Sequence, residues 1–146
     1  MKGREADRPE ERLFLRSKLS DVAQLPVWIE SLASRHPIPE NVAFAINLCL
    51  EEAVSNIILH GFAADSEGSV EVRFTMPRHD LFVFLVEDDA RHFNPLNVPT
   101  ANLGSRVRVG GQGIHFLRQF ADELKYEMTP TGNRLRIAFS AENIAQ

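Results

Sequence analysis

A carboxylate and a carboxamide stand four residues apart in the predominantly apolar stretch from Asn47 to Gly61. They belong to Glu52 and Asn56, and this spacing places both side chains on the same side of a helix, at the edge of its apolar face. A carboxylate can accept a proton from a hydroxyl group, and an amide oxygen is a reasonable ligand for Mg²⁺. The pair therefore predicts the wall of a pocket with a general base and a metal ligand. The alternative is an ordinary pair of solvated polar side chains.

A second candidate site lies where an apolar strand ends in carboxylates, in the segment V-F-L-V-E-D-D-A-R-H-F-N-P from Val83 to Pro95. Asp88 is the carboxylate nearest to the buried end of that strand. An ionised carboxylate can only accept hydrogen bonds, so Asp88 could select a ligand with a donor, such as an exocyclic amine. The alternative is that these acids only solubilise the end of the strand.

A third candidate is the glycine-rich turn Gly110-Gly111-Gln112-Gly113, which stands before a predicted helix. Main-chain N–H groups at such a junction can bind an anion at the N-terminus of the helix. The turn is not a P-loop, because no Gly-Lys-Ser/Thr follows it, and it lacks the G-x-G-x-x-G pattern of a dinucleotide-binding turn. Glycines also serve as helix caps and hinges, so this turn alone is a weak signal.

The elements that must position these residues follow from the periodicity of the apolar side chains. Strands are predicted over residues 13–19, 69–76, 81–87, 124–128 and 134–139, and helices over 20–35, 39–60 and 114–121. Ser20 or Asp21 is expected to cap the start of the first helix, and Gly61 the end of the second. The long segment 88–109 is rich in turn formers and is expected to be a functional or mobile loop. Strands and helices that do not alternate strictly indicate an α+β sandwich, with a mixed or antiparallel sheet under three helices.

Length and composition set limits on the class of protein. The chain has 146 residues, 44% of them hydrophobic and 25% charged, which suits one domain over residues 13–146 after a disordered lead-in over residues 1–12. The lead-in lacks the apolar segment of a secretory signal. A formal net charge of −4 gives no case for direct binding of nucleic acid. No apolar run approaches the ~18 residues of a membrane span. The single cysteine, Cys49, is expected to fill the core, in a reducing, cytoplasmic setting.

The order and spacing of the three motifs are more specific than any one of them. E-A-V-S-N in a helix is followed by D-D-A-R-H-F-N-P after a strand and by G-G-Q-G-I before a helix. In this order the chain closely resembles the anti-sigma-factor serine/threonine kinases of bacterial partner-switching systems, within the GHKL superfamily of histidine kinase-like ATPases. The resemblance covers about Leu13 to Phe139. It implies the two-layer α/β sandwich of the Bergerat-type ATP-binding fold, with a mixed, mostly antiparallel sheet covered by helices on one face.

The resemblance also implies roles for individual residues. Glu52 is similar to the catalytic base of that family, Asn56 to its Mg²⁺ ligand, and Asp88 to the residue that reads the adenine amino group. Further contacts with ATP are implied for Ala90, Phe93, Gly110, Gly111, Gly113 and Ile114. The segment from about residue 95 to residue 109 would form a lid over the nucleotide.

The function implied is that of an ATP- and Mg²⁺-dependent kinase that phosphorylates a STAS-type anti-sigma factor antagonist and sequesters a sigma factor, commonly as a homodimer. Two departures from the family pattern favour an alternative. Ala90 replaces the usual glycine of D-x-G, and Arg136 is expected at the place of a threonine near the adenine. The alternative is a catalytically weak or inactive module of the same fold, which holds a regulatory protein with little or no nucleotide.

Overall fold

The computed structural model describes residues 10–63, 66–94, 96 and 109–141. The strands in this part of the chain are β1 (Glu10–Arg16), β2 (Ser69–Arg78), β3 (Leu81–Asp88), β4 (Glu123–Thr129) and β5 (Gly132–Ser140). The α-helices are α2 (Gln24–Arg35), α3 (Glu40–Asn56) and α4 (Val109–Phe120). A 3-10 helix, η1 (Leu19–Ala23), precedes α2, and a π-helical turn, η2 (Ile57–Gly61), continues α3.

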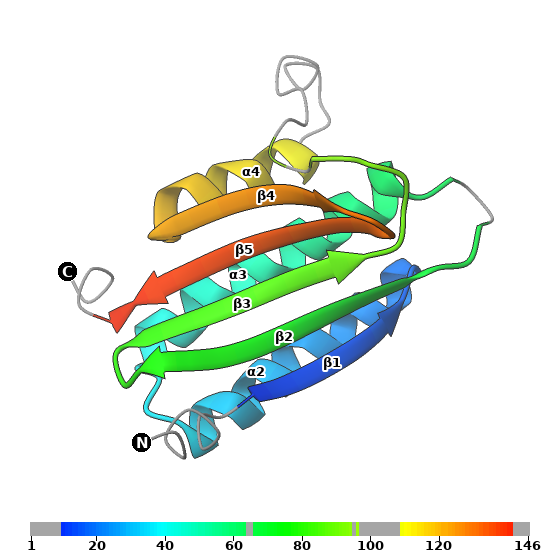
Figure 1. Ribbon diagram of the computed structural model, residues 1–146. Coiled ribbons are helices and arrows are strands. Elements are labelled where there is room, and N and C mark those ends of the chain that lie inside the picture. Colours follow the sequence, from blue (N-terminus) through cyan, green and yellow to red (C-terminus); the bar gives the residue numbers. More distant parts are fainter. Residues whose placement is uncertain (1–9, 64–65, 95, 97–108, 142–146) are drawn as a thin grey trace.

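The strands form one sheet in the order β1-β2-β3-β5-β4, and each neighbouring pair is antiparallel. Figure 1 shows α2, α3 and α4 together on one face of this sheet, with α3 in the middle of the helix layer. The predicted two-layer α+β sandwich is therefore confirmed. Of the two sheet types that the sequence left open, the described strands form the antiparallel one.

The core lies between the helices and the inward-facing side chains of the sheet. Phe74, Phe84 and Phe139 come from three adjacent strands, and each is fully buried. Their ring centroids lie 5.2 Å apart for the first pair and 6.1 Å apart for the second, within the range of favourable aromatic contacts. Trp28 of α2 reaches the same cluster, with its ring 6.2 Å from that of Phe84. The aromatic cluster thus joins the helix layer to the sheet.

The central helix is more apolar than the sequence analysis recognised. Together α3 and η2 form a continuous helix of 22 residues, Glu40–Gly61, whose mean hydropathy of 1.6 would allow it to cross a membrane by length and composition alone. The expectation that no apolar run approaches such a length was therefore wrong. In the 18-residue window of this helix that is apolar enough to span a membrane, 56% is buried inside the fold, as in the central helix of a protein core.

The start of the chain differs from the predicted boundaries. The first strand begins at Glu10, so residues 10–12 belong to β1 and not to the lead-in; residues 1–9 lie outside the described residues. Asp21 does not cap a helix. Its carboxylate accepts a hydrogen bond of 2.8 Å from the main-chain N–H of Arg16 and one of 2.9 Å from the Arg16 guanidinium. This contact ties β1 to η1, and α2 begins at Gln24, after η1 has ended.

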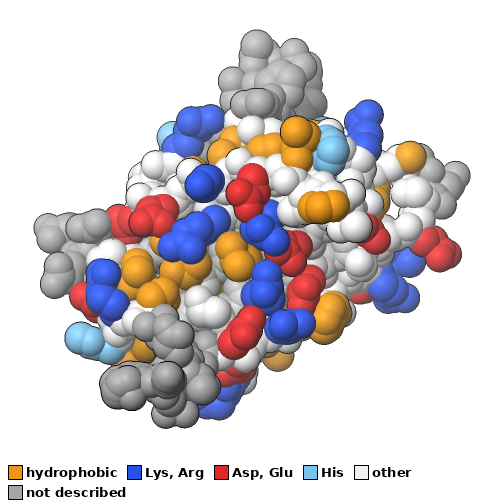
Figure 2. Space-filling view, in the orientation of Figure 1, with side chains coloured by type: hydrophobic (Ala, Val, Ile, Leu, Met, Phe, Trp, Pro, Cys, Tyr) orange, Lys and Arg blue, Asp and Glu red, His pale blue; other side chains and the backbone are white. Residues whose placement is uncertain are grey.

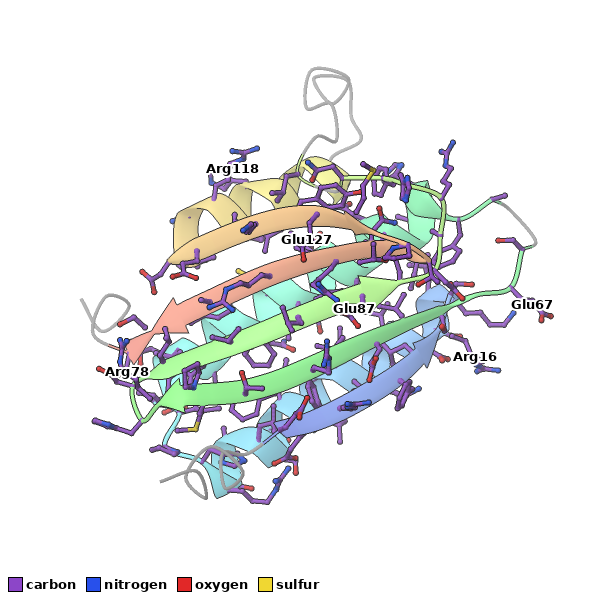
Figure 3. The ribbon with its side chains drawn as sticks, viewed as in Figure 1. Arg16, Glu67, Arg78, Glu87, Arg118 and Glu127 are labelled. Carbon is purple, nitrogen blue, oxygen red and sulfur yellow. The ribbon has the colours of Figure 1, made fainter. Side chains whose placement is uncertain are left out.

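The face of the sheet opposite the helices carries a row of ion pairs. Glu87 of β3 lies between two arginines: it is 3.0 Å from Arg73 on β2 and also contacts Arg134 on β5. Arg134 in turn lies 2.7 Å from Glu127 on β4. Figure 3 shows Glu87 and Glu127 projecting from this face, and Figure 2 shows acidic and basic side chains interleaved across it. The row ties four neighbouring strands together.

Candidate functional site

Glu52 and Asn56 lie one turn apart on α3, as predicted. Asn56 is the last residue of the helix and is fully buried, whereas Glu52 is partly buried at the edge of the apolar face. The Oε1 atom of Glu52 is buried, and no described residue donates a hydrogen bond to it. Burial raises the pKa of Glu52, and the charge of neighbouring Glu51 raises it further. A carboxylate in this state is prepared to accept a proton.

An unpaired buried oxygen is costly, at about 1–3 kcal/mol, and native structures seldom leave one without a reason. The two polar side chains on α3 interrupt an otherwise buried surface formed by Ala45, Cys49, Ala53 and Ile57. A ligand that brings a hydrogen-bond donor to Glu52 would remove this cost. The position of Glu52 therefore favours a binding or catalytic role over a solvated surface pair.

Asp88 lies at the buried end of β3, with 8% of its surface exposed. One of its oxygens, Oδ1, accepts a hydrogen bond of 2.9 Å from the main-chain N–H of Ala90 and one of 2.8 Å from the side-chain amide of Asn133. Burial raises the pKa of Asp88, the two hydrogen bonds oppose this, and the charge of Asp89 adds to the rise. Asp88 therefore lies at the end of a buried strand, as predicted. The two hydrogen bonds fix the orientation of its carboxylate.

Asn133, at the start of β5, is a site residue that the sequence analysis missed, because it treated this residue as part of a turn. Its side chain has only 3% of its surface exposed. Its Nδ2 donates to Asp88 and, at 2.9 Å, to the carbonyl oxygen of Arg91. Its Oδ1 accepts from the main-chain N–H of Phe93, at 2.9 Å, and from the hydroxyl of Tyr126. One carboxamide thus joins β3, β4 and the loop after β3.

Arg136 does not occupy the place that the sequence analysis gave it. Along β5, residues 133, 135, 137 and 139 face the helices, so Arg136 faces the opposite side of the sheet. There its guanidinium lies 3.2 Å from the carboxylate of Glu123. The residue of β5 that pairs with Asp88 is Asn133. The expected departure from the family at Arg136 was therefore wrong.

Ala90 packs against the end of the central helix. It is 8% exposed, and a methyl group placed on Gly61 would lie 3.6 Å from the Ala90 methyl and 3.3 Å from the Phe93 ring. The Phe93 ring also lies beside His60, with centroids 6.2 Å apart. A methyl on Gly61 would thus be in ordinary contact with Ala90 and only slightly tight against the Phe93 ring, so this packing does not require glycine. Gly61 is also not the left-handed cap that the sequence suggested, since its φ is not in that region.

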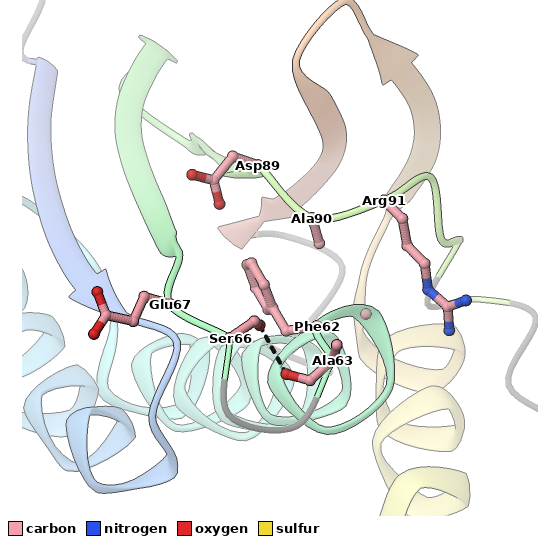
Figure 4. Close-up of a pocket in the computed structure, with 8 residues that line it drawn as sticks. Phe62, Ala63, Ser66, Glu67, Asp89, Ala90 and Arg91 are labelled. Carbon is pink, nitrogen blue, oxygen red and sulfur yellow. Dashed lines mark hydrogen bonds between the residues drawn. The ribbon is translucent and has the colours of Figure 1, made fainter.

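A surface pocket of about 460 Å³ lies beside Ala90, between the end of η2 and the start of the loop after β3 (Figure 4). It is lined by residues 61–63, 66–67 and 89–91. A hydrogen bond of 2.7 Å from the Ser66 hydroxyl to the carbonyl oxygen of Ala63 closes one side. Ala90, one of the predicted ATP contacts, lines this pocket, whereas Glu52, Asn56 and Asp88 do not.

The glycine-rich turn is helical in the structure. Gly110, Gly111, Gly113 and Ile114 belong to α4, which begins at Val109, five residues earlier than predicted. The first N–H groups of a helix have no partner within it, so the predicted binding of an anion there stays a prediction. The side chain of Ile114 and the predicted lid, apart from Leu96 and Val109, lie outside the described residues. In Figure 1 the start of α4, the end of α3 and the end of β3 lie at the same end of the molecule.

The residues present fit a Mg²⁺ ion only if the ligand completes the site. Asn56 can offer one neutral oxygen, and the described residues contain no cluster of three or more His, Cys, Asp or Glu side chains able to hold a metal ion. Mg²⁺ commonly uses few protein ligands and takes its other oxygens from phosphates and water. An ion held by Asn56 together with a nucleotide is consistent with this donor set.

Comparison with known proteins agrees with the fold and the motifs. The family model described as the histidine kinase-like ATPase domain matches residues 15–139. The serine/threonine-protein kinase BtrW of Bordetella bronchiseptica is 24% identical over 112 residues, which cover 75% of this chain and 79% of BtrW. These matches confirm the resemblance drawn from the three motifs.

A solved structure shows the same fold. The histidine kinase domain of the blue-light activated histidine kinase from Erythrobacter litoralis EL346 has a TM-score of 0.54 and 19% identity to this chain. The match covers 86% of this chain but 62% of the other, so this chain spans less than two thirds of that protein's length. An ATPase domain implies nucleotide binding. Because the family match spans most of its length, this protein belongs to the histidine kinase-like ATPase domain family.

Proposed function

We propose that this protein is a cytoplasmic, ATP- and Mg²⁺-dependent serine/threonine protein kinase. The observation that carries the proposal is the buried, unpaired oxygen of Glu52, one turn before Asn56 on a helix that leads to the Asp88 end of the sheet. Phosphoryl transfer depends mainly on positioning and charge stabilisation, together with a residue that receives the proton of the attacking hydroxyl. Glu52 has the chemistry and the burial for the last of these tasks.

The other residues would bind and orient the nucleotide. Asp88 would accept a hydrogen bond from the adenine amino group, and Ala90 and Phe93 would shape the adjoining wall. The first N–H groups of α4, near Gly110, Gly111 and Gly113, would bind the phosphates. Asn56 would hold Mg²⁺, and the bound ion would neutralise part of the charge on the phosphates. Glu52 would then take the proton from a serine or threonine hydroxyl of the substrate protein.

The proposed substrate and partners are those implied by the resemblance. The substrate would be a STAS-type anti-sigma factor antagonist, and the protein would also sequester a sigma factor, acting as a homodimer. The similarity to BtrW, whose name describes it as a serine/threonine-protein kinase, supports the reaction type. Neither nucleic acid nor a membrane is part of the proposal.

Two observations favour a second candidate function. The buried methyl of Ala90 fills space next to Asp88 where the family usually has glycine, and burial raises the pKa of Asp88. Both features would weaken recognition of an adenine amino group. The second candidate is a catalytically weak or inactive partner-switch module that holds a regulatory protein with little or no nucleotide.

Two measurements separate the candidates. Calorimetric titration with ATP and ADP in the presence of Mg²⁺ tests nucleotide binding, and transfer of labelled phosphate to the host's STAS protein tests the reaction. Glu52→Gln should bind ATP nearly as wild type does but lose at least about a hundredfold in transfer rate. The matched control is Glu30→Gln, which makes the same change on the exposed surface of α2.

The outcomes are distinct. Transfer by Glu52→Gln at a rate near that of wild type would remove Glu52 from the role of base. Absence of ATP binding at millimolar nucleotide would rule out the kinase and favour the binding module.

A further inference from the structure

The side chain of Asn133 fixes how Asp88 presents its carboxylate. Among the described residues, the main-chain N–H of Ala90 and the side-chain amide of Asn133 donate hydrogen bonds to Asp88, and both bind the same oxygen, Oδ1. No described residue donates to the other oxygen. The second oxygen of a buried carboxylate is therefore left as an acceptor for a ligand.

The orientation of the Asn133 amide is determined by its surroundings. Its Oδ1 faces two donors, the N–H of Phe93 and the hydroxyl of Tyr126, and its Nδ2 faces two acceptors, the carboxylate of Asp88 and the carbonyl of Arg91. A flipped amide would place its oxygen against both acceptors and lose all four hydrogen bonds. Asn133 must therefore donate to Asp88.

A donor in this position favours the ionised form of Asp88. The Asn133 hydrogen bond lowers the pKa of Asp88 against the rise caused by burial. The charge of Asp89, next to Asp88 in the chain, raises the pKa of Asp88, and the hydroxyl of Tyr126 on β4 reaches Asp88 through Asn133. An ionised Asp88 can accept from a 6-amino group, whereas it repels the carbonyl oxygen of a 6-oxo purine.

We propose that Asn133 is a positioning residue for purine selectivity: by holding Asp88 as an acceptor, it makes the site choose 6-amino purine nucleotides over 6-oxo purine nucleotides. This inference rests on the proposed nucleotide function. Asn133 acts through Asp88 and through the loop that it holds at Arg91 and Phe93.

The test compares binding of ATP and ITP, which differ in the group at position 6 of the purine, to three full-length proteins across a range of pH. They are wild type, Asn133→Leu and the control Arg136→Leu, which lies on the same strand but faces the opposite side of the sheet. Wild type should bind ATP more tightly than ITP. In Asn133→Leu the ratio of the two affinities should be about tenfold smaller, which is the effect of losing one hydrogen bond to a charged group. Arg136→Leu should keep the wild-type preference.

The pH dependence separates positioning from mere structural support. Without the Asn133 donor the pKa of Asp88 rises, so Asp88 is protonated at a higher pH and can donate to the ITP carbonyl. The ATP preference of Asn133→Leu should therefore fall further as the pH is lowered, beginning at a higher pH than in wild type. A general loosening of the loop would weaken the binding of both nucleotides equally and leave the ratio of their affinities unchanged.

A readout without nucleotide accompanies the binding data. NMR titration of the Asp88 side-chain carboxyl carbon should give a higher midpoint in Asn133→Leu than in wild type. If the leucine variant does not fold, Asn133→Ser, which removes the amide but leaves room for water, is measured in the same way.

Each result decides the question. A lower ratio of ATP affinity to ITP affinity in Asn133→Leu, together with a higher titration midpoint of Asp88, supports the inference. An unchanged ratio, or an unchanged midpoint, in a folded variant overturns it. A wild-type protein that binds ATP and ITP equally overturns the inference and leaves the proposed function standing. A wild-type protein that binds neither nucleotide overturns both.

Discussion

Gly132 lies so close to the end of β3 that a methyl group on its α-carbon would come within 1.9 Å of the main-chain carbonyl oxygen of Asp88. The next nearest atoms, the carbonyl carbon of Asp88 and the α-carbon of Asp89, are also main chain and would lie 2.8 Å away. No side-chain rotation can relieve such a contact. The two strands can meet here only because residue 132 is glycine.

Gly132→Ala should therefore destabilise the protein by about 3 kcal/mol, since it forces β3 and β5 apart. The same movement would separate Asp88 from Asn133 and weaken nucleotide binding. Urea denaturation and ATP titration measure the two effects. Gly61→Ala is the comparison, because its nearest contact would be 3.3 Å from a ring carbon of Phe93 and a small shift can accommodate it. Equal losses in the two variants would contradict this account.

Glu52→Gln should make the fold more stable at neutral pH, by about 1 kcal/mol, because it removes a partly buried charge whose ionised form the fold disfavours. The pKa of Glu52 is higher in the folded protein than in the unfolded chain. The wild-type free energy of unfolding therefore falls as the pH rises from the unfolded pKa to the folded pKa. The increase in the free energy of unfolding caused by Glu52→Gln should be small below the ordinary pKa of glutamate. It should grow with pH and reach a plateau above the raised pKa of Glu52.

Urea denaturation of wild type and Glu52→Gln between acid and neutral pH measures this difference, with Glu30→Gln as the surface control. A difference that stays constant with pH would show that the Glu52 carboxylate is not desolvated in the folded protein.

Glu87→Gln should reduce stability at neutral pH by about 1 kcal/mol, because Glu87 is a partly exposed carboxylate held by two arginines. Burial raises its pKa, but the contacts with Arg134 and Arg73 outweigh this, so the pKa is lowered overall. A lowered folded pKa contributes stability above the unfolded pKa, and this is lost as the pH falls through the folded pKa. The cost of the substitution should thus shrink in acid.

High salt should also reduce the cost, because these charges are partly exposed to solvent. Thermal unfolding at several pH values and salt concentrations measures both trends. Glu67→Gln, at an exposed position, is the control. A cost that neither acid nor salt diminishes would mean that Glu87 acts through packing and not through its charge.

Cys49 should resist thiol reagents in the folded protein. It is fully buried on α3, burial raises its pKa to about 12, and its sulfur lies 3.5 Å from the carbonyl oxygen of Phe116 on α4. Reaction with a disulfide reagent at mildly alkaline pH should be at least about a hundredfold slower than for a free thiol, because little thiolate is present. Urea should restore the rate. Rapid labelling of the folded protein would contradict the core role.

Much of the site could be predicted because it depends on local periodicity. A helical repeat places Glu52 and Asn56 together whatever the rest of the chain does, and the end of an apolar strand marks Asp88 without knowledge of its neighbours. The core role of Cys49 followed in the same way and is confirmed by its burial.

What could not be predicted depends on contacts between distant segments. Asn133 meets Asp88 through the pairing register of β3 with β5, and a sequence does not show that register. The error at Arg136 has the same origin, since a shift by an odd number of residues along a strand moves a side chain to the other face. Asp21 was expected to cap a helix, but its carboxylate accepts a hydrogen bond from the guanidinium of Arg16 instead.

The two outermost strands of the sheet have a consequence for how this protein associates with others. β1 exposes Glu10, Arg12 and Arg16 on either side of the exposed Phe14, and β4 exposes Glu123, Lys125 and Glu127 before the exposed Met128. Charged side chains along a free edge oppose the addition of a further strand from another molecule, which is the first step of edge-to-edge aggregation. Concentrated protein should therefore resist fibre formation, and any homodimer is expected to meet through a broad face of the molecule and not by extending its sheet.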